Sequence, residues 1–174
     1  MQSSLFTTLR TAAILAITFV GFSAVSAQAQ TTGTSTMNIT VKDVLQLTVN
    51  TKTVDLVFAT PEDFNKGVSA TVNNQLMVTS NRPYELSVKT AGDLTDGTNK
   101  IPVSNISAQP VGQGIGSAKL VSGLSTTDQV LASDVPPSMS KPITMQYATA
   151  AKNEAFLVPA STYTTTLTFT VSAK

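Results

Sequence analysis

The chain contains no cysteine, no histidine and no tryptophan among its 174 residues. Without cysteine it cannot form a disulfide, so burial and hydrogen bonding alone must hold the fold. Without histidine or cysteine it has no Ser-His-Asp triad, no cysteine nucleophile and no ordinary zinc or copper site. Glycoside hydrolysis needs two carboxylates that converge in a cleft, whereas most acidic residues here stand singly in the sequence. We therefore predict a protein that is not an enzyme and that holds no metal and no cofactor.

Charge is also scarce, since only 12% of the residues are charged. Arg10 is the only charged residue among the first 29, so the remaining 145 residues carry ten basic and ten acidic side chains and no net charge. A neutral chain with scattered charges lacks the electrostatic signature of a nucleic-acid-binding or membrane-surface protein. We predict no nucleic-acid partner.

The first 29 residues have the pattern of a secretory signal peptide. Residues 1–10 carry one positive charge and no acid, residues 11–26 are uncharged and mostly apolar, and Ala27-Gln28-Ala29 supplies small residues at a cleavage site. The apolar run is shorter than the roughly 20 residues that span a bilayer. We expect cleavage before Gln30, export to the periplasm or the cell surface, and no membrane span in the rest of the chain.

The remaining composition favours strands. Threonine fills 24 of the 145 positions after the predicted cleavage site, and threonine and valine are stiff residues that pack well on a pleated surface. Short runs with a period of two are separated by turn residues, and no apolar pattern of helical period extends over ten residues. We predict an all-β fold, an Ig-like antiparallel β-sandwich of about seven to nine strands. A flexible leader is expected at residues 30–36 and a single sandwich domain at residues 37–174.

Alternating apolar residues mark the expected strands. At the N-terminal end, Met37, Ile39 and Val41 alternate with polar residues, and the alternation resumes over residues 45–49. Further runs are expected at residues 54–58, 68–79, 84–88, 101–106, 118–121, 129–132, 143–147 and 165–171. One helical turn is expected after Thr60-Pro61, with Thr60 as its cap and the following acids at its positive end.

One loop has oxygen-bearing side chains at close spacing. Asp93, Asp96 and Asn99 could together bind calcium, although the spacing of an EF-hand loop and its bidentate glutamate are absent. The other interpretation is a tight turn in which Gly97 supplies a positive φ after Asp96. The sequence favours the turn but leaves both interpretations open.

The two ends of the predicted domain resemble a known family. Residues 159–171, with the sequence Pro-Ala-Ser-Thr-Tyr-Thr-Thr-Thr-Leu-Thr-Phe-Thr-Val, resemble the closing strand of bacterial fimbrial subunits. The segment Met37-Asn-Ile39-Thr-Val41, followed by Leu45-Gln-Leu47, is similar to the start of the cysteine-free, alpha-class pilins of chaperone–usher fimbriae. The absence of disulfides, the predicted export and the threonine-rich strands agree with this resemblance.

The resemblance implies a structural subunit of a surface filament or fimbria that assembles by β-strand addition into a homopolymer. The N-terminal segment of one subunit would fill a groove in its neighbour, and a periplasmic chaperone would cover that groove before assembly. The donor strand implied in this way carries Gly33, where backbones would approach closely, and Met37, Ile39 and Val41, which would enter pockets at period two. The C-terminal strand implied to line the groove carries Tyr163, Leu167, Phe169 and Val171.

The alternative function is a self-contained Ig-like extracellular module that binds a glycan or a protein ligand. In that case the loops at residues 91–100 and 111–117 would carry the binding, and the chain would be a monomer with all its strands paired internally.

Overall fold

The computed structural model describes residues 31–174, so the predicted signal peptide and its cleavage site lie outside the described residues. The chain divides into one unit that ends at Ile39 and a second, compact unit from Thr40 to Lys174. Residues 31–44 have no secondary structure, and the first strand begins at Leu45. The strand expected at residues 37–41 is therefore not formed in the single chain. Alternation fixes which side chains share a face, but a strand also needs a neighbour to pair with.

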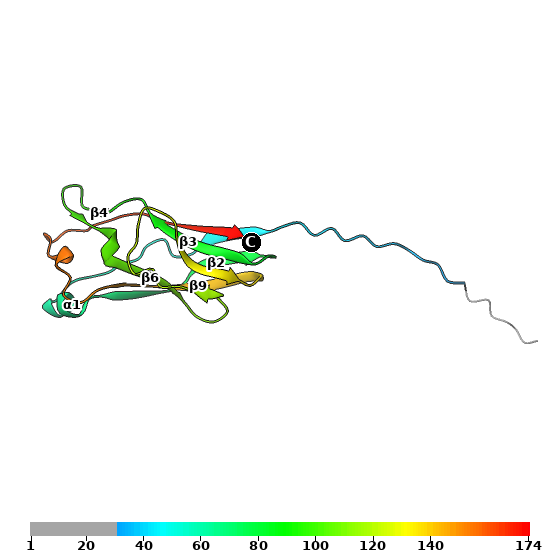
Figure 1. Cartoon of the computed structure of the whole chain (residues 1–174), viewed down its shortest axis with the longest axis horizontal. Helices are drawn as coiled ribbons and strands as arrows, with labels where there is room; N and C mark the ends of the chain where they lie inside the picture. The colour runs from blue at the N-terminus through cyan, green and yellow to red at the C-terminus, as the bar shows by residue number, and fades with distance from the viewer. Residues whose placement is uncertain (1–30) are drawn as a thin grey trace, which may run out of the picture. The chain divides into compact units, whose positions relative to one another are not determined.

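The compact unit contains two four-stranded antiparallel sheets that lie face to face (Figure 1). The first sheet consists, in spatial order, of β1 (Leu45–Val49), β2 (Ser69–Ser80), β9 (Ser138–Thr149) and β6 (Ile106–Val111). The second consists of β10 (Leu167–Ala173), β3 (Tyr84–Thr90), β8 (Gln129–Val135) and β7 (Ser117–Ala118).

The remaining elements are short. A separate two-stranded ladder pairs β4 (Leu94–Thr95) with β5 (Lys100–Ile101). The helical pieces are α1 (Pro61–Lys66) and the 3-10 turns η1 (Val103–Asn105) and η2 (Glu154–Phe156). The predicted all-β antiparallel sandwich is confirmed. The described residues form ten strands, one more than the expected range, and the two-residue strand β4 lies where the sequence predicts a loop.

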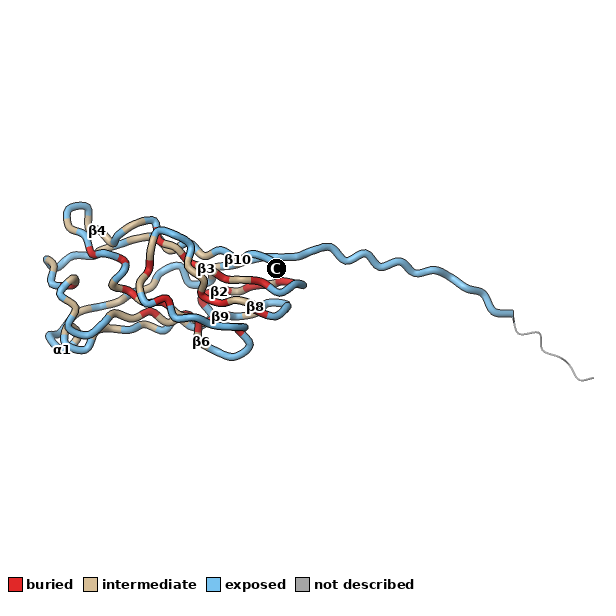
Figure 2. Tube along the Cα trace, in the orientation of Figure 1, coloured by how far each residue is buried: buried red, intermediate tan, exposed pale blue. Residues whose placement is uncertain are grey.

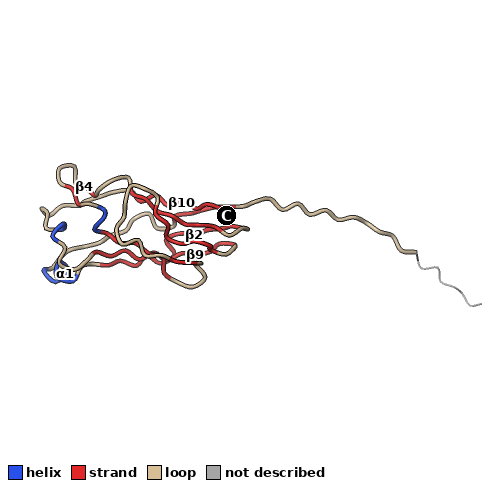
Figure 3. The backbone as a smooth tube through the Cα atoms, in the orientation of Figure 1, coloured by secondary structure: helices blue, strands red, loops and turns tan. Residues whose placement is uncertain are grey.

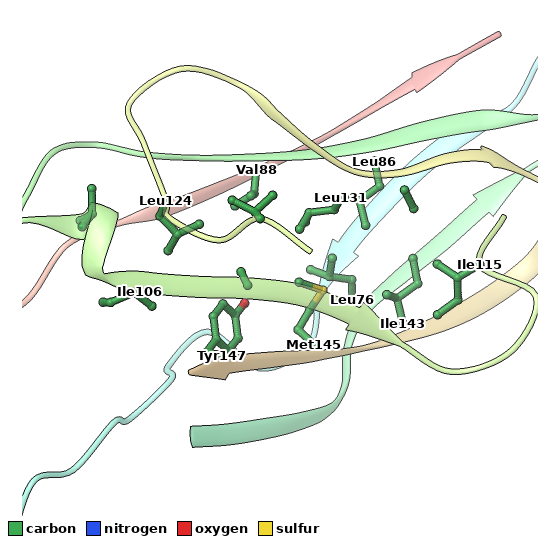
Figure 4. Packing of buried hydrophobic residues seen from close by; sticks show 14 of the residues in the cluster. Leu76, Leu86, Val88, Ile106, Ile115, Leu124, Leu131, Ile143, Met145 and Tyr147 are labelled. Carbon is green, nitrogen blue, oxygen red and sulfur yellow. The ribbon is translucent and has the colours of Figure 1, made fainter. Parts of the chain in front are cut away.

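The core lies between the two sheets. Figure 4 shows Leu76, Met145 and Tyr147 of the first sheet pointing toward Leu86 and Val88 of the second. All five side chains are 2% exposed or less. Complete burial of an aliphatic side chain contributes about 1.5–3 kcal/mol, and this layer accounts for the stability of a fold that has no disulfide.

A bulge in β2 determines where β1 ends. The register between β2 and β9 shifts between Val72 and Leu76, and Asn74 adopts a φ of 51° there. The buried Gln75 accepts a hydrogen bond from the Tyr147 hydroxyl at 2.8 Å, and its carbonyl accepts one from the Asn50 amide at 2.8 Å. Past Asn50 the chain leaves the first sheet.

The helical turn expected after Thr60-Pro61 is confirmed as α1. The Asp63 carboxylate accepts hydrogen bonds from the amides of Ala59 and Thr60 and from the Thr60 hydroxyl, at 2.7 to 2.9 Å. These donors hold the pKa of Asp63 below its ordinary value. The helical turn carries Phe64, whose ring lies 5.0 Å from that of Phe58.

Three further expected runs differ from the structure. The run at residues 118–121 is interrupted: β7 covers only Ser117–Ala118, and Val121 forms a single antiparallel bridge with Ala108. Residues 54–58 alternate as expected but form no strand, because no other segment of residues 31–174 pairs with them. The run at residues 101–106 is broken rather than bulged: β5 ends at Ile101, η1 follows Pro102, and β6 begins at Ile106.

Candidate functional site: an open edge of the sandwich

The C-terminal strand β10 is the edge strand of the second sheet and, within the part of the chain that the structure describes, pairs only with β3. Its threonines face outward and are exposed, while Leu167, Phe169 and Val171 face inward, as the alternation predicts. These inward side chains are only partly buried. Leu86 and Val88, directly opposite in β3, are fully buried. The inward face of β10 therefore lacks a covering neighbour on one side.

A second strip of partly buried apolar side chains begins on β1, the edge strand of the first sheet. It runs from Leu47 and Val49 through Val54, Leu56 and Phe58, and each of these packs against the core while remaining partly exposed. Residues 52–58 make no backbone hydrogen bond to another residue of the described chain. Figure 3 shows this segment as an irregular stretch between β1 and α1.

The two strips lie on the same side of the molecule, because β1 and β10 contact each other. We call residues 45–58 and 163–173 together the open edge. Unpaired backbone groups beside an apolar strip form a template for the addition of another strand. The open edge therefore has the chemical properties of a strand-accepting site.

One end of the open edge is tied by the turn between β2 and β3. The side chain of Asn81 accepts a hydrogen bond from the Val44 amide at 2.9 Å and donates one to the Lys42 carbonyl at 2.8 Å. Arg82 forms an ion pair with Asp43 at 2.9 Å and donates a second hydrogen bond to the Lys174 carbonyl at 2.8 Å. Arg82 thus bridges the start of β1 and the end of β10.

Near the other end of the open edge, Tyr163 is partly buried and donates a hydrogen bond to the Pro159 carbonyl at 2.9 Å. Desolvation and the negative charge of Asp96 raise the pKa of the Tyr163 hydroxyl. The residue that follows, Thr164, forms an isolated antiparallel bridge with Thr95. Tyr163 thus lies beside the β4–β5 ladder, just before β10.

The residues of the implied donor strand are exposed in the single chain. Met37, Ile39 and Val41 are 84%, 79% and 77% exposed, and Figure 2 shows the segment that carries them as exposed along its length. Apart from its two chain neighbours, no described residue has a heavy atom within 4 Å of the position that a Cβ of Gly33 would take. Three large apolar side chains are thus left in water at alternate positions, at a cost that burial against a partner would remove.

The carboxylates of the candidate calcium loop are used to close the loop. Asp96 accepts hydrogen bonds from the amides of Thr98 and Asn99 at 2.9 and 2.7 Å, and Asp93 accepts one from the Val103 amide at 3.1 Å. The backbone donors of Asn99 and Thr98 lower the pKa of Asp96 to about 2. This geometry matches the tight-turn interpretation. Within residues 31–174 no three side chains of the His, Cys, Asp or Glu type are grouped so that they could hold a metal ion.

One loop of the alternative binding module, at residues 91–100, borders a shallow hollow. Two shallow hollows on the fold are lined mainly by serine, threonine, asparagine and alanine, with no aromatic ring in either. Ligand sites are usually lined by apolar and aromatic side chains with a few placed polar groups.

Among the described residues, no helix has the length and apolar character needed to cross a membrane.

Comparison of the chain with models of known protein families and with curated proteins finds no match. The site is therefore defined by its own geometry.

The sequence pattern marks the apolar side chains of the open edge, but it does not mark the turn at residues 80–83 that bonds to one end of this edge. Residues 80–83 have the composition of an ordinary turn. Asn81 and Arg82 bind residues 37 to 92 positions away in the chain, and nothing in the local sequence marks such contacts. The role of Gln75 is equally hidden, because a glutamine inside a strand pattern normally indicates an exposed position.

Proposed function

We propose that this chain is a structural subunit of a surface filament, in which residues 31–41 of one copy add as a strand to the open edge of the next. The observation that carries the proposal is the open edge itself, where apolar side chains of β1, residues 54–58 and β10 remain partly exposed beside unpaired backbone. The exposed alternation of Met37, Ile39 and Val41 supplies a segment of matching character.

The lengths of the two partners support the same proposal. Residues 31–41 are eleven in number, and β10 has seven residues. A strand rises about 3.3 Å per residue, so residues 31–41 extend over roughly 36 Å and β10 over roughly 23 Å. The added strand is therefore long enough to pair along the whole of β10.

The energetics favour addition. Burying Met37, Ile39 and Val41 contributes about 1.5–3 kcal/mol for each side chain. Each new main-chain hydrogen bond contributes about 0.5–1.5 kcal/mol. The added strand would also cover Leu167, Phe169 and Val171, which no neighbour in the single chain covers completely.

The wider setting belongs to the same proposal. The signal pattern of residues 1–29 supports export, with the filament at the cell surface. A subunit that carries an unfilled apolar edge is prone to aggregate, so a periplasmic chaperone that covers the open edge until assembly is the expected partner.

The proposal is tested with the predicted mature chain, residues 30–174, and with a truncated chain of residues 42–174. The full mature chain should form filaments in negative-stain micrographs, and the truncated chain should remain a monomer in size-exclusion chromatography. A synthetic peptide of residues 31–41 should bind the truncated chain in a one-to-one ratio and raise its melting temperature.

A matched pair of substitutions makes the test specific to one face of the strand. Ile39→Asp should abolish filaments because it places a charge on the inward face, whereas Thr40→Asp on the outward face should leave them intact. A mature chain that stays monomeric at all concentrations would contradict the proposal and would favour the self-contained binding module instead.

A further inference from the structure

Building on the function proposed above, we propose that the Asn81–Arg82 turn keeps the N-terminal segment out of the open edge of its own chain and so reserves it for a second copy. The inference concerns the choice between insertion within one chain and insertion between chains. Insertion within one chain would yield a closed monomer and no filament.

The sequence pattern by itself would permit self-insertion. A three-residue turn at residues 42–44 would let the N-terminal segment fold back along the free edge of β1. Directly opposed residues of antiparallel strands point to the same face. The opposed pairs would be 41 with 45, 39 with 47 and 37 with 49. Every pair is apolar, and Leu47 and Val49 already pack against the core.

The structure holds residues 42–44 in a different conformation. The pairing of Leu45 with Ser80 in the β1–β2 ladder continues to Val44 and Asn81, which exchange two hydrogen bonds: the Val44 amide donates to the Asn81 side chain at 2.9 Å, and the Asn81 amide donates to the Val44 carbonyl at 3.3 Å. The Asn81 side chain also holds the Lys42 carbonyl. Residues 42–44 cannot form a reversing turn while these bonds exist.

A turn placed earlier in the chain would not allow self-insertion with the same apolar contacts. If residues 39–41 made the reversal, Ile39 and Val41 would lie in the turn and would no longer enter the strip. Most of the apolar contact that favours insertion would then be lost.

Arg82 adds a second obstacle. A self-inserting strand that reverses at residues 42–44 would have to enter between the start of β1 and the end of β10. The guanidinium of Arg82 spans that position, bonded to Asp43 on one side and to the Lys174 carbonyl on the other. A strand from a second copy is not joined to this chain at residue 42 and does not need to reverse there.

The experiment compares four chains of residues 30–174: wild type, Asn81→Ala, the double variant Asn81→Ala/Arg82→Ala, and Asn105→Ala. Asn105 also makes two side-chain hydrogen bonds, with Pro102 and Asn153, but far from residues 42–44 in the sequence, so it is the matched control. Size-exclusion chromatography over a range of concentrations measures the monomer fraction, and hydrogen exchange measures the protection of amides 37–41 within it.

The double variant should show a concentration-independent monomer fraction roughly tenfold larger than that of wild type, as expected for the loss of several hydrogen bonds. Amides 37–41 should be protected in this monomer. Asn81→Ala should show the same change to a smaller extent, and Asn105→Ala should behave as wild type.

A disulfide that can be formed and then reduced, which we call the lock, distinguishes the proposed effect from a folding defect in these variants. The chain has no cysteine, so Asp43→Cys/Arg82→Cys in the Asn81→Ala background would create one defined disulfide. The side chains of these two residues already meet in the ion pair between Arg82 Nη1 and Asp43 Oδ2 at 2.9 Å, so the disulfide would join the same two points of the chain. The oxidised protein should form filaments, and the reduced protein should form the closed monomer.

The outcomes separate this inference from the proposed function. If wild type forms filaments while the double variant forms them equally well with unprotected amides 37–41, the inference is overturned and the proposed function stands. The same holds if the oxidised and reduced forms of the lock variant assemble alike. If wild type itself forms no filaments, both proposals fail.

Discussion

Val88 of β3 and Phe169 of β10 are register partners in one sheet, yet Val88 is fully buried while Phe169 remains partly exposed. Both side chains face the core. The difference arises because β3 has a strand on each side and β10 has one on a single side. Phe169 is thus one of the partly exposed apolar side chains of the open edge. The contrast with Val88 leads to predictions about the stability of the chain and about its assembly.

Two leucines should differ sharply in their contribution to the free energy of unfolding of the single chain. Leu86→Ala removes a fully buried side chain and should lower this free energy by about 2–5 kcal/mol. Leu167→Ala affects a partly exposed side chain of the open edge and should lower it by less than about 1.5 kcal/mol. Urea unfolding of residues 42–174 measures both values. Equal losses would show that β10 is already fully covered.

Two buried tyrosines should respond in opposite ways to loss of the hydroxyl. The Tyr147 hydroxyl donates to Gln75 at 2.8 Å, so Tyr147→Phe leaves a buried acceptor unsatisfied and should lower stability by about 1–3 kcal/mol. The Tyr84 hydroxyl is buried with no partner among the described residues, so Tyr84→Phe should be neutral or stabilising. Thermal unfolding of both variants tests this, and a larger loss for Tyr84→Phe would contradict it.

Gly67, which follows α1, should not tolerate a side chain. Its φ is 77°, and a Cβ there would lie 2.5 Å from the Thr149 carbonyl oxygen. Gly67→Ala should therefore lower stability by about 2–4 kcal/mol through strain and displacement of the backbone. Gly92 has open space at the corresponding position, so Gly92→Ala should change stability by less than about 0.5 kcal/mol. Chemical denaturation that ranks the two variants in the reverse order would contradict this account of the turn.

The Asp96 carboxylate should make the fold sensitive to acid. Its pKa is about 2 in the folded chain, below the ordinary value of 3.8. A lowered pKa means that the carboxylate stabilises the fold above about pH 4, and that this contribution is lost as the pH falls toward 2.

Asp96→Asn is the matched variant, because it keeps an acceptor oxygen for the amides of Thr98 and Asn99 and has no titrating group. Wild type should melt at a higher temperature than Asp96→Asn at pH 6, and the gap should narrow between pH 4 and pH 2. A gap that stays constant over this range would mean that the charge of Asp96 does not stabilise the loop.

The sequence was sufficient to predict the faces of the strands, because alternation is a local property. The inward series Leu167, Phe169 and Val171 and the opposing strand β3 match their expected faces. The same alternation over residues 37–41 and 54–58 does not produce strands. Pairing depends on distant segments, and the pattern gives no information about whether a partner exists in the same chain.

The chemistry of the site was predictable only in part. The apolar residues of the open edge stand out in the sequence because they repeat at period two. The contacts of Asn81 and Arg82 are long-range hydrogen bonds that start from a turn. The residue types alone do not predict these bonds, because not every asparagine or arginine in a turn forms them. Long-range polar contacts of this kind depend on the completed topology.

The origin of the strand that fills the open edge can be measured directly, because the absence of cysteine allows cross-links to be placed at will. Chains of residues 30–174 with Ile39→Cys are mixed with chains that carry Leu167→Cys, Phe169→Cys or Val171→Cys, and are oxidised mildly. At least one mixture should yield disulfide-linked dimers between different chains, and the outward-facing control Thr168→Cys should not. The absence of cross-links between the two kinds of chain in all three mixtures would contradict strand addition between copies.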